Sequence, residues 1–158
     1  MRDNDWLEQK LEFIWQSYFA DVKRTNNVNI KFGKRASTRL GSIKKSNRSK
    51  VFETEITMTG FFKDERVPEY IIDLTIAHEL CHYVHGFSSP LPQLFKYPHL
   101  GGLVDKELIR RGMGEQLIEQ KKWLKKEWTA IVGNDFRVRT RRRPKAKRRT
   151  SIFDLIFG

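Results

Sequence analysis

Apolar residues recur at steps of three and four positions near the start of the chain. This spacing predicts an amphipathic helix over residues 5–22, because residues three and four apart share one helix face. The apolar positions of this helix are Leu7, Leu11, Ile14, Trp15, Tyr18 and Phe19. Asn26 and Asn27 interrupt the pattern. The first element is therefore expected to cover a core with one side.

The pattern then changes to an alternation of apolar and polar residues, which is typical of strands. Val28, Ile30 and Phe32 alternate with polar neighbours. Residues 40–45 form a second candidate strand. Residues 52–59 form the third, which is rich in the β-branched residues that strands favour. The sequence thus predicts three short strands after the first helix.

A longer apolar segment follows and predicts a helix from Pro68 to His85, ended by Gly86. Residues 87–101 contain three prolines and are expected to form a loop. Helical patterns return over residues 103–111 and 115–132. Strands that follow one another, with helices on either side in the sequence, predict an α+β fold. We expect a short, mainly antiparallel sheet packed against the helix at 68–85.

Composition limits the class of protein. The chain has 158 residues, which suits one domain, and no apolar run reaches the length of a membrane span. The first residues lack the apolar stretch of a signal peptide, and Cys81 is the single cysteine. The sequence therefore predicts a cytoplasmic protein without disulfides, without a membrane partner and without a second, cysteine-based metal site.

The net charge of +12 is concentrated in two blocks. Residues 22–52 contain ten Lys and Arg residues and no acid, and residues 136–149 contain nine more, again without an acid. The second block is too charged to pack and is predicted to be a disordered tail that binds nucleic acid, which would associate the protein with the nucleoid. Its candidate contacts are Arg137, Arg139, Arg141, Arg142, Arg143, Lys145, Lys147, Arg148 and Arg149.

The last residues, 150–158, form a short apolar segment. One interpretation is that this segment docks on the body of the protein. The other is that residues 149–157 form a peptide for a partner's groove, with a weak likeness to peptides that bind sliding clamps through Ile152, Leu155 and Ile156.

The string from His78 to His82 reads H-E-x-x-H within the helix predicted at 68–85. Residues four apart lie on one helix face, so His78 and His82 can bind one Zn²⁺. Glu79 adjoins the first histidine and can act as the base on a water bound by the metal. The motif therefore predicts metal-assisted hydrolysis with Glu79 as the catalytic residue.

A catalytic zinc site needs a third protein ligand. His99 is the preferred candidate, because it stands in a loop that can fold back over the helix; Glu107 is the alternative, and Asp105 is a weaker one. His85 is almost two turns from His78 and is expected to orient a ligand or to line the cleft. Cys81 points away from the line of the two motif histidines and is expected to be structural.

At these residues the chain resembles the SprT-like zinc metallopeptidases, which include the Spartan proteases. Over residues 5–115 the resemblance rests on four segments in order: Ile30–Arg35 with Arg39–Ser42, then Glu55–Thr59, then Ala77–His82, then Pro98–Gly102. It implies a small zincin-like domain in which His78, His82 and His99 bind zinc and Glu79 is the base. Many members also carry a cysteine-rich zinc ribbon, for which this chain lacks the cysteines; the basic tail stands in its place.

The sequence thus predicts a zinc-dependent endopeptidase over residues 1–135, followed by the basic tail at 136–149 and the apolar end at 150–158. The resemblance implies protein substrates associated with nucleic acid or crosslinked to DNA. Two alternatives stay open. One is a non-catalytic nucleic-acid-binding protein with a structural zinc site, and the other is a metal hydrolase that acts on bonds other than peptides.

Overall fold

A computed structural model describes residues 1–48, 50 and 52–133 of the chain. The predictions made for the basic tail, for its nine Lys and Arg residues and for the apolar end at 150–158 lie outside these residues. The described elements are α1 (Asn4–Tyr18), β1 (Val28–Phe32), β2 (Gly41–Ser46), β3 (Glu53–Met58), η1 (Gly60–Lys63), α2 (Glu69–Val84), η2 (Leu100–Gly102), α3 (Leu103–Arg110) and α4 (Gly114–Val132). The predicted α+β class is confirmed.

The sheet is mixed, and the expectation of a mainly antiparallel sheet is wrong. Its strand order is β1-β3-β2, so β3 lies in the centre. β1 pairs with β3 in parallel, with Ile30 opposite Ile56, whereas β2 pairs with β3 antiparallel, with Ile43 opposite Ile56. The parallel pair arises because β2, which follows β1 in the sequence, occupies the opposite edge of the sheet.

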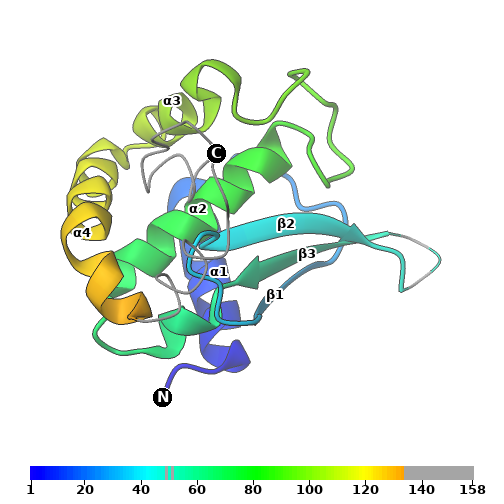
Figure 1. Ribbon diagram of the computed structural model, residues 1–158. Coiled ribbons are helices and arrows are strands. Elements are labelled where there is room, and N and C mark those ends of the chain that lie inside the picture. The colour runs from blue at the N-terminus through cyan, green and yellow to red at the C-terminus, as the bar shows by residue number, and fades with distance from the viewer. Residues whose placement is uncertain (49, 51, 134–158) are drawn as a thin grey trace, which may run out of the picture.

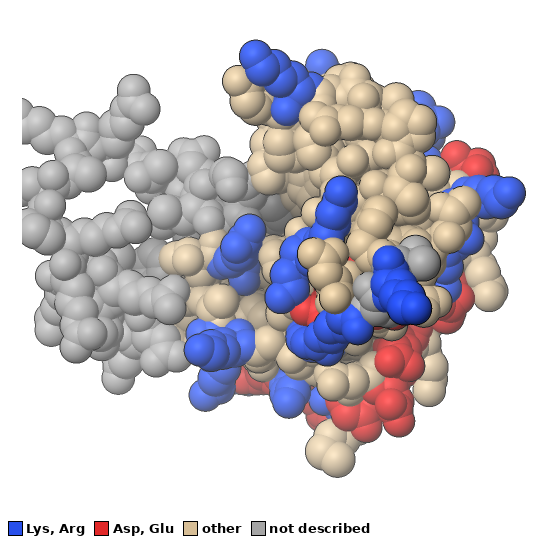
Figure 2. Space-filling view, turned by 90° about the vertical axis from the view of Figure 1, so that its right-hand side faces the viewer, with Lys and Arg blue, Asp and Glu red and all other residues tan. Residues whose placement is uncertain are grey.

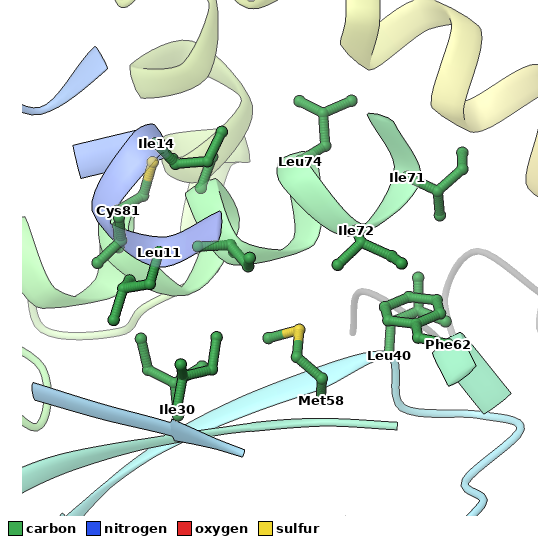
Figure 3. Close-up of a cluster of buried hydrophobic side chains, with 14 of the residues drawn as sticks. Leu11, Ile14, Ile30, Leu40, Met58, Phe62, Ile71, Ile72, Leu74 and Cys81 are labelled. Atoms are coloured by element: carbon green, nitrogen blue, oxygen red, sulfur yellow. The ribbon is translucent and has the colours of Figure 1, made fainter. Parts of the chain in front are cut away.

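One face of the sheet carries the helices. α1 and α2 lie side by side on that face, and α3 and α4 pack against α2 on the side away from the strands (Figure 1). The core lies between α1, α2 and the sheet, where Ile30 and Met58 of the strands face apolar side chains of both helices (Figure 3). α2 is thus buried on most sides, which explains its long apolar sequence.

α1 ends earlier than its apolar pattern predicts. The helix stops at Tyr18, and Phe19 is its C-cap. The side chain of Arg111 reaches across from the end of α3 and donates hydrogen bonds to the carbonyl of Tyr18 (2.8 Å) and to the carboxylate of Asp21 (2.6 Å). This contact between segments far apart in the sequence holds residues 19–22 in a turn instead of a further helical turn.

Candidate metal centre

The motif histidines stand on the second half of α2. The helix begins after Pro68, with Glu69 in its first turn, and its C-cap is His85. Gly86 then adopts a positive φ of 84°, and a Cβ at this position would lie 2.2 Å from the carbonyl oxygen of Pro92. Only glycine fits this turn, which reverses the chain.

The proline-containing loop returns over the helix and is held at several points. The backbone N–H of Phe87 donates to the carbonyl of His82, and that of Leu94 donates to the carbonyl of His85, both at 2.9 Å. Ser89 Oγ donates to the carbonyl of Tyr83 (2.7 Å). These bonds fix the loop against α2, and the loop brings His99 to the motif histidines.

The ring nitrogens of His78, His82 and His99 that could bind a metal all lie within 4.8 Å of one another. Nε2 of His99 is 3.0 Å from Nε2 of His82. The ring centroids are 4.9 Å apart for His78 and His82, 4.7 Å for His82 and His99, and 5.6 Å for His78 and His99. Within the described part of the chain, these three residues form the one such group of potential ligands.

The environment keeps these imidazoles neutral, which is the form that binds metals. Burial, helped by the neighbouring His99, lowers the pKa of His78 to about 3. Burial also lowers the pKa of His82 to about 3, helped by His78. The pKa of His99 is lowered as well, by burial and then by the charge of Arg39.

The geometry suits a zinc ion. Two nitrogens bound to one tetrahedral zinc at its usual bond length lie about 3.4 Å apart. The Nε2 atoms of His82 and His99 are 3.0 Å apart, and the potential ligand atoms of all three histidines lie within 4.8 Å of one another. The nitrogen donors, their number and their neutral state therefore fit a divalent metal ion such as zinc.

Glu79 lies beside this group and is 5 % exposed. Burial raises the pKa of its carboxyl to about 8, although the positive charge of Arg39 opposes the rise. A Cβ built on Gly41 of β2 would come within 3.0 Å of Oε1 of Glu79, so the carboxyl group is held between α2 and the first residue of β2.

A cleft of about 500 Å³ opens over the three histidines and Glu79. One wall is the segment that leads into β2 together with the start of that strand, and the other is the returning loop. The described residues that line the cleft are Thr38, Arg39, Leu40, Gly41, Ser42, Ile43, Thr75, His78, Glu79, His82, Phe87, Ser88, Pro98 and His99. A molecule in this cleft would contact both the histidine group and the edge strand.

The alternative ligands lie elsewhere. Glu107 binds Arg111 (2.9 Å) and Arg110 (2.6 Å), and it is not part of the group that contains His99. Asp105 forms an ion pair with Lys121 (2.6 Å). The structure therefore brings His99, and neither acid, to His78 and His82.

His85 and Cys81 are buried outside the cleft. The ring of His85 packs edge-on against Phe95, with centroids 4.9 Å apart, and its Nε2 lies 3.9 Å from Glu107. His85 thus lies beneath the returning loop. Cys81 belongs to the hydrophobic core beside Leu11 and Ile14 of α1, and burial raises the pKa of its thiol (Figure 3).

Arg39 and Gly41 also line the cleft, and neither was predicted from the sequence to belong to the site. Both belong to the segment Arg39–Ser42, which carried part of the family resemblance. This resemblance was the one feature of the sequence that could have linked the two residues to the site, because their residue types alone indicate no chemistry.

A scan against protein-family models and searches of curated proteins and of solved structures found no match to this chain. None of the helices in the part of the chain that the structure describes is long and apolar enough to cross a membrane.

Proposed function

We propose that this chain is a zinc-dependent endopeptidase. The observation that carries the proposal is the group of three neutral imidazoles, with metal-binding nitrogens within 4.8 Å of one another, next to a buried carboxyl group at the base of an open cleft. Three protein donors in an accessible cleft are the usual arrangement of a catalytic zinc site, whereas structural sites are closed by four protein donors.

In this proposal His78, His82 and His99 hold the zinc ion. A zinc ion held there would acidify water and polarise a substrate carbonyl. Glu79 accepts a proton from water and later donates it to the amine that leaves when the peptide bond breaks. Burial raises the pKa of this carboxyl, which makes its carboxylate a stronger proton acceptor.

The shape of the cleft also supports the proposal that the substrate is an extended polypeptide. β2 is an edge strand that pairs, among the described strands, with β3 alone. Gly41, Ser42 and Ile43 of β2 line the cleft. An edge strand offers backbone N–H and C=O groups that an extended peptide can pair with, so a peptide laid along β2 would pass over the histidine group.

The zincin-like and SprT-like assignment is part of the same proposal. The four segments that carry the resemblance contribute β1 and the turn after it, one wall of the cleft, the central strand β3, the motif part of α2, and His99. Arg39–Ser42, Ala77–His82 and Pro98–Gly102 supply residues that line the cleft, and the other two stretches form strands of the sheet. That three segments separate in the sequence meet at one cleft supports a shared function for them.

A group of basic side chains on the sheet supports the proposal that the substrates are associated with nucleic acid. Lys31 and Lys44 each lie 3.1 Å from Glu55 on the open face of the sheet, and Arg48 lies 3.7 Å from it. Three cations around one buried acid leave a net positive charge. Figure 2 shows Lys and Arg side chains gathered on this side of the molecule, with Asp and Glu side chains along one border. Such a surface attracts a phosphate backbone.

Two measurements test the proposal on the full chain. Metal analysis of the purified protein should find one zinc per chain, and the Glu79→Gln variant should keep that zinc while it loses cleavage of an unfolded protein substrate. A variant that cleaves as fast as the parent would contradict the role of Glu79. Zinc at full occupancy with no cleavage by the parent, and unfolding upon chelation, would favour the structural zinc site instead.

A further inference from the structure

Arg39 places a permanent positive charge at the cleft. Among the described residues that line the cleft, it is the one Lys or Arg, and Glu79 is the one acid. The side chain of Arg39 is exposed, and no described carboxylate lies within ion-pair distance of it.

The backbone around Arg39 is held rigidly. The backbone N–H of Ala36 donates to Thr59 Oγ1 (3.0 Å), and that hydroxyl donates to the carbonyl of Ala36 (2.8 Å). The indole of Trp128 donates to the carbonyl of Ser37 (2.9 Å). On the other side of Arg39, Leu40 is buried in the core. The backbone that carries Arg39 is therefore held in place at the wall of the cleft, and the guanidinium of Arg39 is available to a bound molecule.

Arg39 also stands close to the point where a peptide would be cleaved. It precedes Gly41, which faces Glu79, by two residues, and two residues of extended chain span at most about 7 Å. A substrate paired with the edge of β2 would place the side chains nearest its scissile bond beside Arg39. The guanidinium offers a fork of donors that matches a carboxylate.

We propose that Arg39 binds a carboxylate of the substrate, so that the enzyme prefers to cut next to Asp or Glu. This inference rests on the proposed peptidase function and names its substrate class. Arg39 acts here as a residue that determines specificity. The absence of acidic residues from 22 to 52 agrees with this assignment, because the approach to this wall of the cleft favours negatively charged segments.

The test uses the zinc-loaded full chain and sets of peptides that differ only in having Glu, Gln or Lys at each position next to the scissile bond. At one or more positions, the parent should cleave the Glu peptide about 10- to 100-fold faster than the Gln peptide, measured as kcat/KM. In Arg39→Ala this ratio should fall to about one, and in Arg39→Glu the Lys peptide should be preferred. Lys34→Ala, which removes a neighbouring exposed charge, should keep the ratio of the parent.

A binding measurement separates this inference from the proposed function. In the Glu79→Gln background, the Glu peptide should bind more tightly than the Gln peptide, and Arg39→Ala should remove that difference, whether or not the parent cleaves. Equal binding of the two peptides, or a preference that survives in Arg39→Ala, would overturn the role of Arg39. The role of Arg39 would also be overturned if Arg39→Ala weakened the binding of an oligonucleotide and left the peptide preference unchanged. Arg39 would then contact a phosphate group.

Discussion

Gly41 at the start of β2 faces Glu79 of α2 so closely that a methyl group on Gly41 would lie 3.0 Å from Oε1 of Glu79. The same methyl group would lie 2.9 Å from Cε of Met58 and 3.0 Å from Cγ2 of Thr75. The edge strand and the motif helix therefore approach each other where the carboxyl group lies. A glycine at this position leaves room for Glu79 beneath the cleft.

On the proposed peptidase function, Gly41→Ala should impair peptide cleavage while zinc stays bound. The added methyl group has to displace Glu79 or separate β2 from α2, so we expect at least a tenfold fall in kcat/KM and a loss of about 1–3 kcal/mol of stability. Peptide cleavage, zinc content and thermal unfolding measure the three effects. Gly114→Ala is the matched control, because its Cβ would meet Ile109 at 3.5 Å, an ordinary contact. Full activity in Gly41→Ala would show that the contact does not position Glu79.

His99→Ala and Glu107→Gln should separate the two candidate third ligands. We expect His99→Ala to weaken zinc binding by more than about 100-fold, because it removes one of the three donors that lie together. Glu107→Gln should leave zinc affinity unchanged and lower stability, because Glu107 pairs with Arg111. Competition with a chelator of known affinity gives the zinc affinities. A loss of zinc in Glu107→Gln that equals the loss in His99→Ala would contradict this assignment.

Arg111→Ala should destabilise the fold strongly. The Arg111 side chain is 4 % exposed, binds Asp21 and Glu107, and lies 4.3 Å from the ring centroid of Phe19. Its loss leaves the carbonyl of Tyr18 and the acid partners without this donor, and we expect a cost of about 3 kcal/mol. Arg110→Ala is the control, since Arg110 binds the same Glu107 but is 62 % exposed, and it should cost less than about 1 kcal/mol. Urea titrations measure both values.

Glu55→Gln should lower stability in a way that depends on pH. Burial alone would raise the pKa of Glu55, but Lys31 and Lys44 outweigh it and hold the pKa below the usual 4.5. A carboxyl group whose pKa is lower in the folded state stabilises that state above about pH 4.5, and this contribution disappears as the pH falls through the folded-state pKa. The variant should therefore be less stable than the parent by about 1 kcal/mol at pH 7, and the difference should close in acid.

Glu53→Gln is the control for that experiment. Glu53 stands on the same strand, and its oxygens accept hydrogen bonds from the amides of Asn27 and Asn29. Its replacement should change stability little, because these partners are neutral side-chain amides. The free energy of unfolding of Glu55→Gln is compared with that of the parent from pH 7 to pH 3. If the difference stays constant over this range, Lys31 and Lys44 do not stabilise the fold through the charge of Glu55.

The helices and strands were predictable because their signals are local. The predicted helix from Pro68 to His85 corresponds to α2 at Glu69–Val84, and the predicted helix at 115–132 corresponds to α4 at Gly114–Val132. Backbone hydrogen bonds in a helix join residues four apart, so a pattern over a few turns is enough to indicate it. Where a distant residue intervenes, as Arg111 does at the end of α1, the local pattern gave the wrong boundary.

The sequence by itself determined the α+β class and placed His78, Glu79 and His82 on one helix, because all of these follow from spacing within a segment. Only the tertiary structure decided the rest. It put β2 at the edge and β3 in the centre, it chose His99 over Glu107 as the neighbour of the motif histidines, and it brought Gly41 and Arg39 to Glu79. These relationships join segments far apart in the chain, and they are fixed by how the apolar faces pack together, which no local pattern contains.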